Sequence, residues 1–239
     1  MTAPVSEIVA VLESQADPDR AERESAYLKS SLRHLGVRVP AIRKATRAAM
    51  RTHGVTARTD VVALADALWA EPVHERRVAA VEALRYRANA LTVADLASIE
   101  RLLREARTWA LVDFLASDVT GVVVANFPEA GDVLDRWAVD DDFWIRRSAL
   151  LALLVPLRNG AGDWPRFSRY ADAMLDEREF FIRKAIGWVL RDTAKRQPDL
   201  VQDWLRDRPG RVPVLAVREA VKPLPEPTRT ELIGRARRR

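Results

Sequence analysis

The sequence contains no cysteine, and this absence excludes several kinds of site. Without thiols the chain has no disulfide, no thiolate-bound zinc and no cysteine nucleophile. Histidine is scarce too, since the only three are His34, His53 and His74. They lie far apart along the chain and in no ligand spacing such as HExxH, so we expect solvated or helix-end imidazoles. We therefore expect no metal and no cofactor.

Long apolar runs are lacking as well. No N-terminal segment has the charged, apolar and small-residue order of a signal peptide. No apolar run reaches the ~20 residues that a membrane span needs. These absences lead us to expect a cytoplasmic protein that makes no contact with a membrane.

Lysine is rare, and the basic residues are nearly all arginine. The formal net charge is +5, and the chain ends in a basic segment made of Arg235, Arg237, Arg238 and Arg239. A positive balance of this kind favours a polyanionic partner, although net charge alone does not distinguish a DNA-binding protein from any other basic protein.

The overall composition is that of an ordinary globular protein, with 48% apolar and 31% charged residues in a chain of 239. This length suffices for a well-buried core and does not require a second domain. We expect one extended domain covering residues 1–239, and a monomer.

Helical periodicity runs through most of the sequence, with short breaks that are typical of helix ends. The breaks fall at Pro40, Pro72, Thr92, Pro128, Asp142, residues 160–162, Pro198, Pro209 and Pro223. Thr92 to Asp95 resembles an N-terminal capping arrangement, and residues 140–142 place acids where a helix dipole favours them. Residues 119–124 could form a strand, but no second strand exists to pair with them, so we predict helix there.

An internal repeat appears when residues 143–150 are aligned with residues 180–187. An aromatic residue, isoleucine, two bases and a small residue recur in register, a fainter copy begins at Glu75, and the segment from Thr108 fills the interval between. Such periods indicate helix pairs that stack because no single pair can bury its apolar face alone. We therefore predict an all-α, HEAT-like helical repeat solenoid, an α-α superhelix, with a basic concave groove.

Basic pairs recur with the repeat and would line the groove on the second helix of each pair. Their spacing suits contacts to a phosphate backbone. For any single base, an ion pair between repeats is an equally good interpretation, and only the recurrence in register favours phosphate. The pairs are Arg76 with Arg77, Arg146 with Arg147, and Arg183 with Lys184.

Trp109 and Asp113 are four residues apart on a predicted helix, so they share a face. The carboxylate interrupts a nearly apolar run, where an acid is costly unless it is paired, exposed in a groove or used in chemistry. Taken alone, a structural ion pair is the commoner explanation. Trp188 follows Lys184 by four residues and shares its face, although Gly187 beside it could equally mark close helix packing. We assign the other tryptophans, Trp69, Trp137, Trp164 and Trp204, to packing.

These segments resemble the AlkD-like family of DNA alkylation repair glycosylases, and the likeness covers nearly the whole chain. The most specific segment is residues 179–191, followed by residues 109–113 and 144–147, with residues 27–29 and 35–40 near the N-terminus. One departure is Ala110, where we expect the family to have a polar or acidic residue.

The resemblance implies roles for individual residues. Asp113 matches the catalytic carboxylate, and Trp109 and Trp188 match the aromatic pair that lines the site. Arg147 matches a phosphate-contacting arginine and Tyr27 an N-terminal DNA contact. We assign four further residues to the DNA-binding set, namely Lys184, Arg43, Lys44 and Arg77.

The expected activity is hydrolysis of the N-glycosidic bond of positively charged N3- or N7-alkylated purines in double-stranded DNA, leaving an abasic site. Two alternatives stay open. One is a HEAT-repeat protein that binds damaged or branched DNA without chemistry, and the presence of Asp113 with both tryptophans favours activity over it. The other is a scaffold whose groove binds a helix of a protein partner, and salt-sensitive DNA binding would distinguish it.

Overall fold

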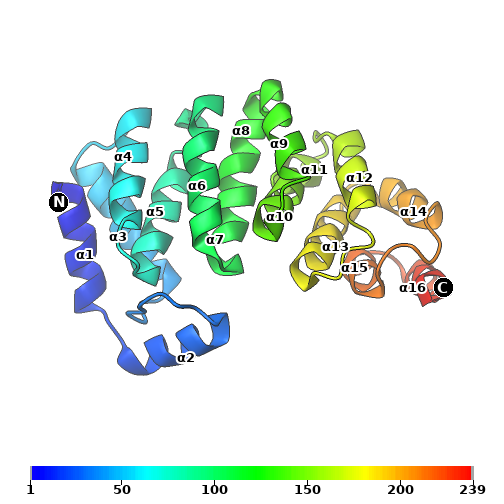
Figure 1. Ribbon diagram of the computed structural model, residues 1–239, viewed down its shortest axis with the longest axis horizontal. Coiled ribbons are helices and arrows are strands. Elements are labelled where there is room, and N and C mark those ends of the chain that lie inside the picture. Colours follow the sequence, from blue (N-terminus) through cyan, green and yellow to red (C-terminus); the bar gives the residue numbers. More distant parts are fainter. Residues whose placement is uncertain (1, 238–239) are drawn as a thin grey trace. The chain divides into compact units, whose positions relative to one another are not determined.

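The computed structural model describes residues 2–237, and these residues are mostly helical (Figure 1). Within this range no strand forms, and the only β pairing is an isolated bridge between Arg33 and Val73. The predicted all-α class is confirmed. Arg238 and Arg239 of the basic C-terminus lie outside the described residues.

The chain divides into two compact units, Met1–Leu115 (unit 1) and Ala116–Arg239 (unit 2). Unit 1 contains α1 (Ala3–Ser14), α2 (Pro18–Leu28), α3 (Val39–Thr52), α4 (Arg58–Trp69), α5 (His74–Tyr86), the 3-10 turns Ala88–Ala90 and Val93–Asp95, α6 (Leu96–Ala106) and α7 (Trp109–Phe114). Within unit 1, α2 runs crosswise to its neighbours α1 and α5 (Figure 1).

Unit 2 holds the second half of the helices. After the π-helix Leu115–Thr120 come α8 (Gly121–Asn126), the 3-10 turn Pro128–Ala130, α9 (Gly131–Trp137), α10 (Phe143–Leu151), α11 (Leu154–Arg158), α12 (Trp164–Ala173), α13 (Phe180–Ala194), α14 (Pro198–Arg206), α15 (Val214–Ala220) and α16 (Glu226–Arg237).

The positions at which helices begin show the predicted repeat. α5, α7, α10, α13 and α15 start at intervals of about 35 residues, a spacing typical of helix-pair repeats. In unit 1, α5 packs on α3, α4 and α7, and α6 packs on α7; in unit 2, α13 packs on both α10 and α15. Within each unit, successive helices of this series thus contact one another, which is the HEAT-like arrangement expected from the sequence.

Side-chain caps start the helices where the sequence predicts. The Asp142 carboxylate accepts a hydrogen bond from the Trp144 N–H at 2.8 Å, and the Asp95 carboxylate accepts one from the Thr92 N–H at 2.8 Å. Each cap satisfies a backbone group that the first helical turn leaves without an intrahelical partner.

Close approach of helices explains Gly187 in α13. A Cβ atom there would lie 2.7 Å from Glu219 Cβ and 2.8 Å from the Ala216 carbonyl oxygen, so only glycine lets α15 pack this closely. This confirms the packing interpretation of Gly187.

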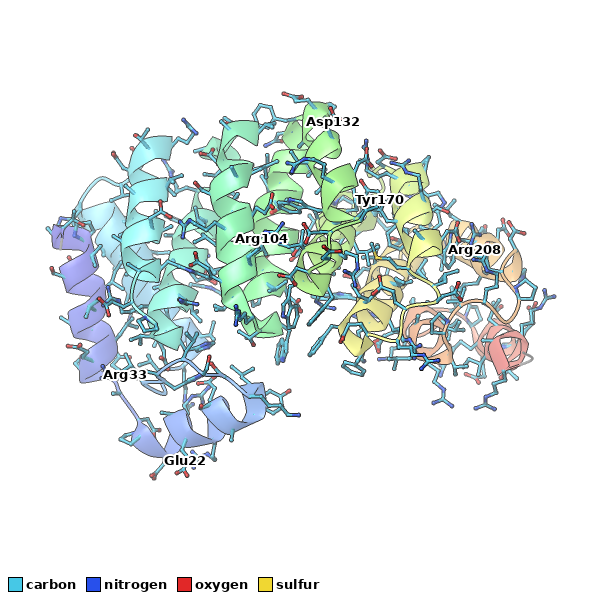
Figure 2. All side chains as sticks on the ribbon, viewed as in Figure 1. Glu22, Arg33, Arg104, Asp132, Tyr170 and Arg208 are labelled. Carbon is cyan, nitrogen blue, oxygen red and sulfur yellow. The ribbon has the colours of Figure 1, made fainter. Side chains whose placement is uncertain are left out.

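Three of the four tryptophans assigned to packing lie in the core of their units, and Trp164 is partly exposed. Trp69 and Trp137 are 1% exposed and Trp204 is 4% exposed. Trp164 packs on Phe167, with ring centroids 5.4 Å apart. Two side chains labelled in Figure 2 connect neighbouring segments of unit 2. Tyr170 of α12 donates a hydrogen bond to Asp135 of α9 at 2.5 Å, and Arg208 donates two hydrogen bonds to Asp172 of α12.

Residues 119–124 are helical, as predicted, but they are entered through the π-helix that follows α7. The continuous stretch Trp109–Asn126 is long and apolar enough, by length and composition alone, to cross a membrane. Half of it is buried against other parts of the protein, as in the core helix of a globular domain. The expectation of no membrane contact stays a prediction.

Candidate active site

Asp113 is the penultimate residue of α7, one helical turn after Trp109. Thr108 is extended (φ −149°, ψ 139°), so the helix begins at Trp109 and places the indole and the carboxylate on the same face. Asp113 is nearly buried, with 9% of its surface exposed, whereas Phe114 beside it is 40% exposed. The π-helix starts directly after Phe114, and π-helical turns inside helices are frequent at functional sites.

Tyr27 meets Trp109 across unit 1. Their ring centroids are 6.1 Å apart and their planes are at 89°, an edge-to-face arrangement. Tyr27 is 73% exposed and stands in the last turn of α2, just before Lys29 ends that helix with a positive φ of 50°. The structure thus brings the predicted N-terminal DNA contact against an indole of the predicted catalytic set.

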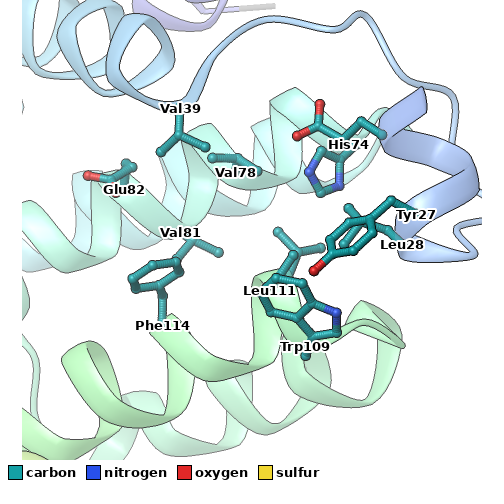
Figure 3. A pocket seen from close by; sticks show the side chains of 12 residues that line it. Tyr27, Leu28, Val39, His74, Val78, Val81, Glu82, Trp109, Leu111 and Phe114 are labelled. Carbon is teal, nitrogen blue, oxygen red and sulfur yellow. The ribbon is translucent and has the colours of Figure 1, made fainter. Parts of the chain in front are cut away.

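These two rings border a pocket of ≈ 180 Å³. Figure 3 shows Tyr27 and Trp109 facing each other at one end and Phe114 with Val81 at the other. The pocket walls come from α2, α3, α5 and α7 and are mostly apolar, with Val39, His74, Val78, Glu82, Ala110 and Leu111 among the lining residues.

Two buried glutamates of α5 hold the segments around this pocket. The Glu75 carboxylate is fully buried and accepts hydrogen bonds from three consecutive backbone N–H groups, those of Leu35 at 2.9 Å, Gly36 at 2.6 Å and Val37 at 3.3 Å. These bonds attach the loop after α2 to the start of α5, and therefore position the helix that carries Tyr27.

Glu82, two turns further along α5, accepts hydrogen bonds from two arginines. Arg43 donates to it twice, at 3.0 Å each, and Arg85 donates at 3.2 Å. The Arg85 guanidinium also lies 5.3 Å from the centroid of the Phe114 ring. Arg43, a predicted DNA contact, is therefore engaged within the protein, whereas Lys44 next to it is exposed.

Arg77, another predicted DNA contact, has an internal role in unit 1. Its guanidinium lies 4.8 Å from the centroid of the Trp69 ring and donates to the Glu105 carbonyl oxygen at 2.9 Å. Burial lowers the pKa of this guanidinium, and the Glu105 charge opposes that shift in part. Its contact with phosphate stays a prediction.

In unit 2, Lys184 and Trp188 lie one turn apart on α13, and both are partly exposed. The Lys184 ammonium is 3.8 Å from a Glu219 carboxylate oxygen and 6.0 Å from the Phe180 ring centroid. Burial raises the pKa of Glu219, but the hydrogen bond from Lys222 and the charges of Lys184, Lys222 and Arg191 outweigh it, so the net pKa shift is downward.

The adjacent arginines of α10 differ sharply. Arg146 donates twice to Glu177, at 2.9 and 2.8 Å, and to two backbone carbonyls, and the Glu177 hydrogen bonds raise its pKa. For Arg146 the ion-pair interpretation is therefore the one that the structure favours. Arg147 is 4% exposed, donates to the Phe181 carbonyl and lies 5.7 Å from that ring's centroid; its phosphate contact stays a prediction.

The expectation of solvated or helix-end histidines holds for His53, and for His74 as a helix-end residue, but it is wrong for His34, which lies in the loop after α2 with both ring nitrogens buried. His53 follows the last residue of α3 and pairs with Glu7 at 2.8 Å. His74 begins α5, yet it is 4% exposed and stacks on His34, with ring centroids 4.4 Å apart. The α2 segment covers this helix end, and burial, with the His34 and Arg77 charges, lowers the pKa of His74 to about 3.

Sequence reasoning missed the two glutamates and the pocket walls. A signal was present, because Glu75 and Glu82 are seven residues apart and share a face of one predicted helix. Two acids on a buried face require partners. Nothing in the sequence named those partners, since they are backbone N–H groups and arginines from other segments.

Known proteins resemble this chain in sequence and in fold. The family model described as DNA alkylation repair enzyme matches residues 8–224. A solved structure described as a predicted DNA alkylation repair enzyme from Enterococcus faecalis is 21% identical, with a TM-score of 0.78 over 89% of this chain and 98% of that one. The structure of smu.31 from Streptococcus mutans UA159 is 16% identical, with a TM-score of 0.54 over 84% of this chain and 96% of that one. No curated protein matches significantly.

Proposed function

The chain belongs to the family of DNA alkylation repair enzymes, and from this premise we propose that it is a monofunctional DNA glycosylase. Its substrates are N3- or N7-alkylated purines in double-stranded DNA, and its products are the free base and an abasic site. The observation that carries the proposal is the Asp113 carboxylate on α7, one turn from Trp109, whose ring meets Tyr27.

The alkylated base needs no general acid. A purine alkylated at N7 or N3 is already positively charged, so it leaves as a neutral molecule when it takes the electron pair of the C1′–N bond. Water then adds its oxygen to C1′ and releases a proton. One carboxylate is therefore sufficient, whereas most glycoside hydrolases use two.

Asp113 supports this reaction by electrostatics. The sugar gains oxocarbenium character as the base departs, and a fixed anion near C1′ stabilises that charge more than it stabilises the ground state. The near-complete burial of Asp113 supports the assignment, because a charge acts more strongly where water is excluded. The same carboxylate can orient the attacking water.

Tryptophan rings are suited to the same cationic sugar. The face of an indole attracts positive charge, and the attraction is worth about 1–2 kcal/mol when the site is desolvated. Trp109 is partly exposed and borders the unit 1 pocket. Trp188 stays a candidate on the family resemblance of residues 179–191 alone.

The proposal of a monofunctional enzyme rests on the lysines. A Schiff base requires a neutral amine, and lysine is tuned to that state by desolvation or by a cationic neighbour. Lys184 instead lies 3.8 Å from the Glu219 carboxylate, an anionic neighbour and not a cationic one. By family resemblance Lys184 stays in the proposed DNA-binding set, together with Lys44 and Arg147.

Incubation with methylated duplex DNA tests the function directly. The protein is expected to release 7-methylguanine or 3-methyladenine, seen by chromatography of the freed bases, without cutting the strand until alkali is added. Strand cleavage without alkali would contradict the monofunctional mechanism. Binding of methylated duplex with no base release would support the alternative of a DNA-binding protein without chemistry.

Salt dependence of DNA binding tests the assignment of Lys44. Replacing an exposed lysine that contacts phosphate reduces the slope of log K against log salt by about 1. We expect this reduction for Lys44→Ala, measured by fluorescence anisotropy with an undamaged duplex at several salt concentrations. Lys195→Ala is the matched control, because Lys195 is also exposed and is paired with Asp192 at 2.7 Å. Equal slopes for the two variants would remove Lys44 from the interface.

A further inference from the structure

Three potential metal ligands meet in unit 1 from separate parts of the chain. Glu24 of α2, His34 of the following loop and Glu75 of α5 each place one ligand atom within 4.8 Å of the others. His34 and His74 stack with their planes at 9°, which leaves the ring edges, and so the nitrogens, available to other groups.

Several polar atoms in this cluster have no hydrogen-bond partner among the described residues, although they are buried. They are Glu24 Oε2, both ring nitrogens of His34, and Nδ1 of His74. A buried polar atom without a partner costs free energy, so four such atoms in one place indicate that something else binds there.

Glu75 retains capacity for a ligand as well. A carboxylate offers about four acceptor positions, and the backbone N–H groups of Leu35, Gly36 and Val37 occupy three of them. On Glu24, Arg20 pairs with Oε1, at 3.6 Å, and leaves Oε2 without a partner.

We propose that Glu24, His34 and Glu75 bind a divalent transition-metal ion, and that Zn²⁺ is the ion best suited to them. An imidazole with two carboxylates is a borderline ligand set, which suits zinc, whereas calcium and magnesium prefer oxygen ligands alone. The bound ion connects α2 to the start of α5 and stabilises the helix that carries Tyr27. The site adjoins the pocket bordered by Tyr27 and Trp109, because Glu24 also lines that pocket, but metal binding does not depend on the proposed glycosylase chemistry.

Titration calorimetry with ZnCl₂ on chelator-treated protein tests the site. We expect one ion per chain for the wild type and at least a tenfold loss of affinity for both Glu24→Gln and His34→Phe. The first variant keeps the shape of the side chain, and the second keeps a ring that can stack on His74. His53→Asn is the matched control, because it removes the imidazole paired with Glu7 elsewhere in unit 1 and leaves the three ligands intact.

A second readout distinguishes loss of ligands from loss of folding. Co²⁺ bound at the site gives visible absorption bands that the Glu24→Gln variant should lack, while its circular dichroism stays that of the wild type. The proposal would be overturned if the wild type did not bind Zn²⁺, or if both ligand variants bound it with the affinity of the wild type. Neither result depends on whether the protein excises bases.

Discussion

Asp113→Asn is expected to reduce base release from methylated duplex DNA by about 100-fold or more. The substitution keeps the size of the side chain but removes the negative charge that stabilises the developing oxocarbenium ion, and losing one such electrostatic group typically costs about 10²–10³ in kcat. The measurement is the single-turnover rate of 7-methylguanine release, followed by chromatography.

The control for this prediction is Asp66→Asn. Asp66 lies on α4 of the same unit, is 43% exposed and pairs with Arg101, so its replacement should leave the release rate unchanged. Duplex binding and the melting temperature of Asp113→Asn should stay close to the wild-type values. A variant that still releases 7-methylguanine at the wild-type rate would show that the carboxylate is not catalytic.

Gly36→Ala is expected to have the largest effect on stability. Gly36 has φ +80°, a conformation that costs an L-residue about 1–2 kcal/mol, and a Cβ atom there would lie 2.1 Å from the Asp17 carbonyl oxygen at the start of α2. Relieving that overlap adds about 1–3 kcal/mol. We expect the free energy of unfolding to fall by about 2–5 kcal/mol and the melting temperature by about 5–15 °C.

Gly54→Ala separates the two contributions. Gly54 also has a positive φ, of +64°, but a Cβ atom there meets nothing within 4 Å. Its replacement should therefore carry only the backbone cost of about 1–2 kcal/mol. Thermal melting of both variants measures the difference, and equal losses would mean that the loop at Gly36 adapts without strain.

Much of the fold was predictable because helix signals are local. Apolar periodicity, proline breaks and capping acids identified helix starts such as Phe143 and Pro198, and the recurrence of residues 143–150 at 180–187 indicated stacked pairs. The pairing of Trp109 with Asp113 also followed from helix geometry. Tyr27 was assigned only by resemblance, and its contact with Trp109 needed the structure, since the two rings belong to different helices.

Prediction from the sequence fails most clearly where two adjacent residues of the same type have different surroundings in the structure. Arg146 and Arg147 are neighbours in one motif, but Arg146 is held by Glu177, 31 residues away, while Arg147 is buried against Phe181. No local pattern distinguishes them. The same holds for His74, whose burial depends on the α2 segment folding over the start of α5.

The sequence by itself determined the helical class, the repeat, the family and the residue types available for chemistry, because these depend on local periodicity and on motif identity. Only the tertiary structure decided which groups meet. The Glu75 carboxylate reaches backbone N–H groups as far as 40 residues away, and the Glu24, His34 and Glu75 cluster joins three segments. Such contacts arise from how helices pack, and packing energy is shared among many side chains that no short stretch of sequence contains.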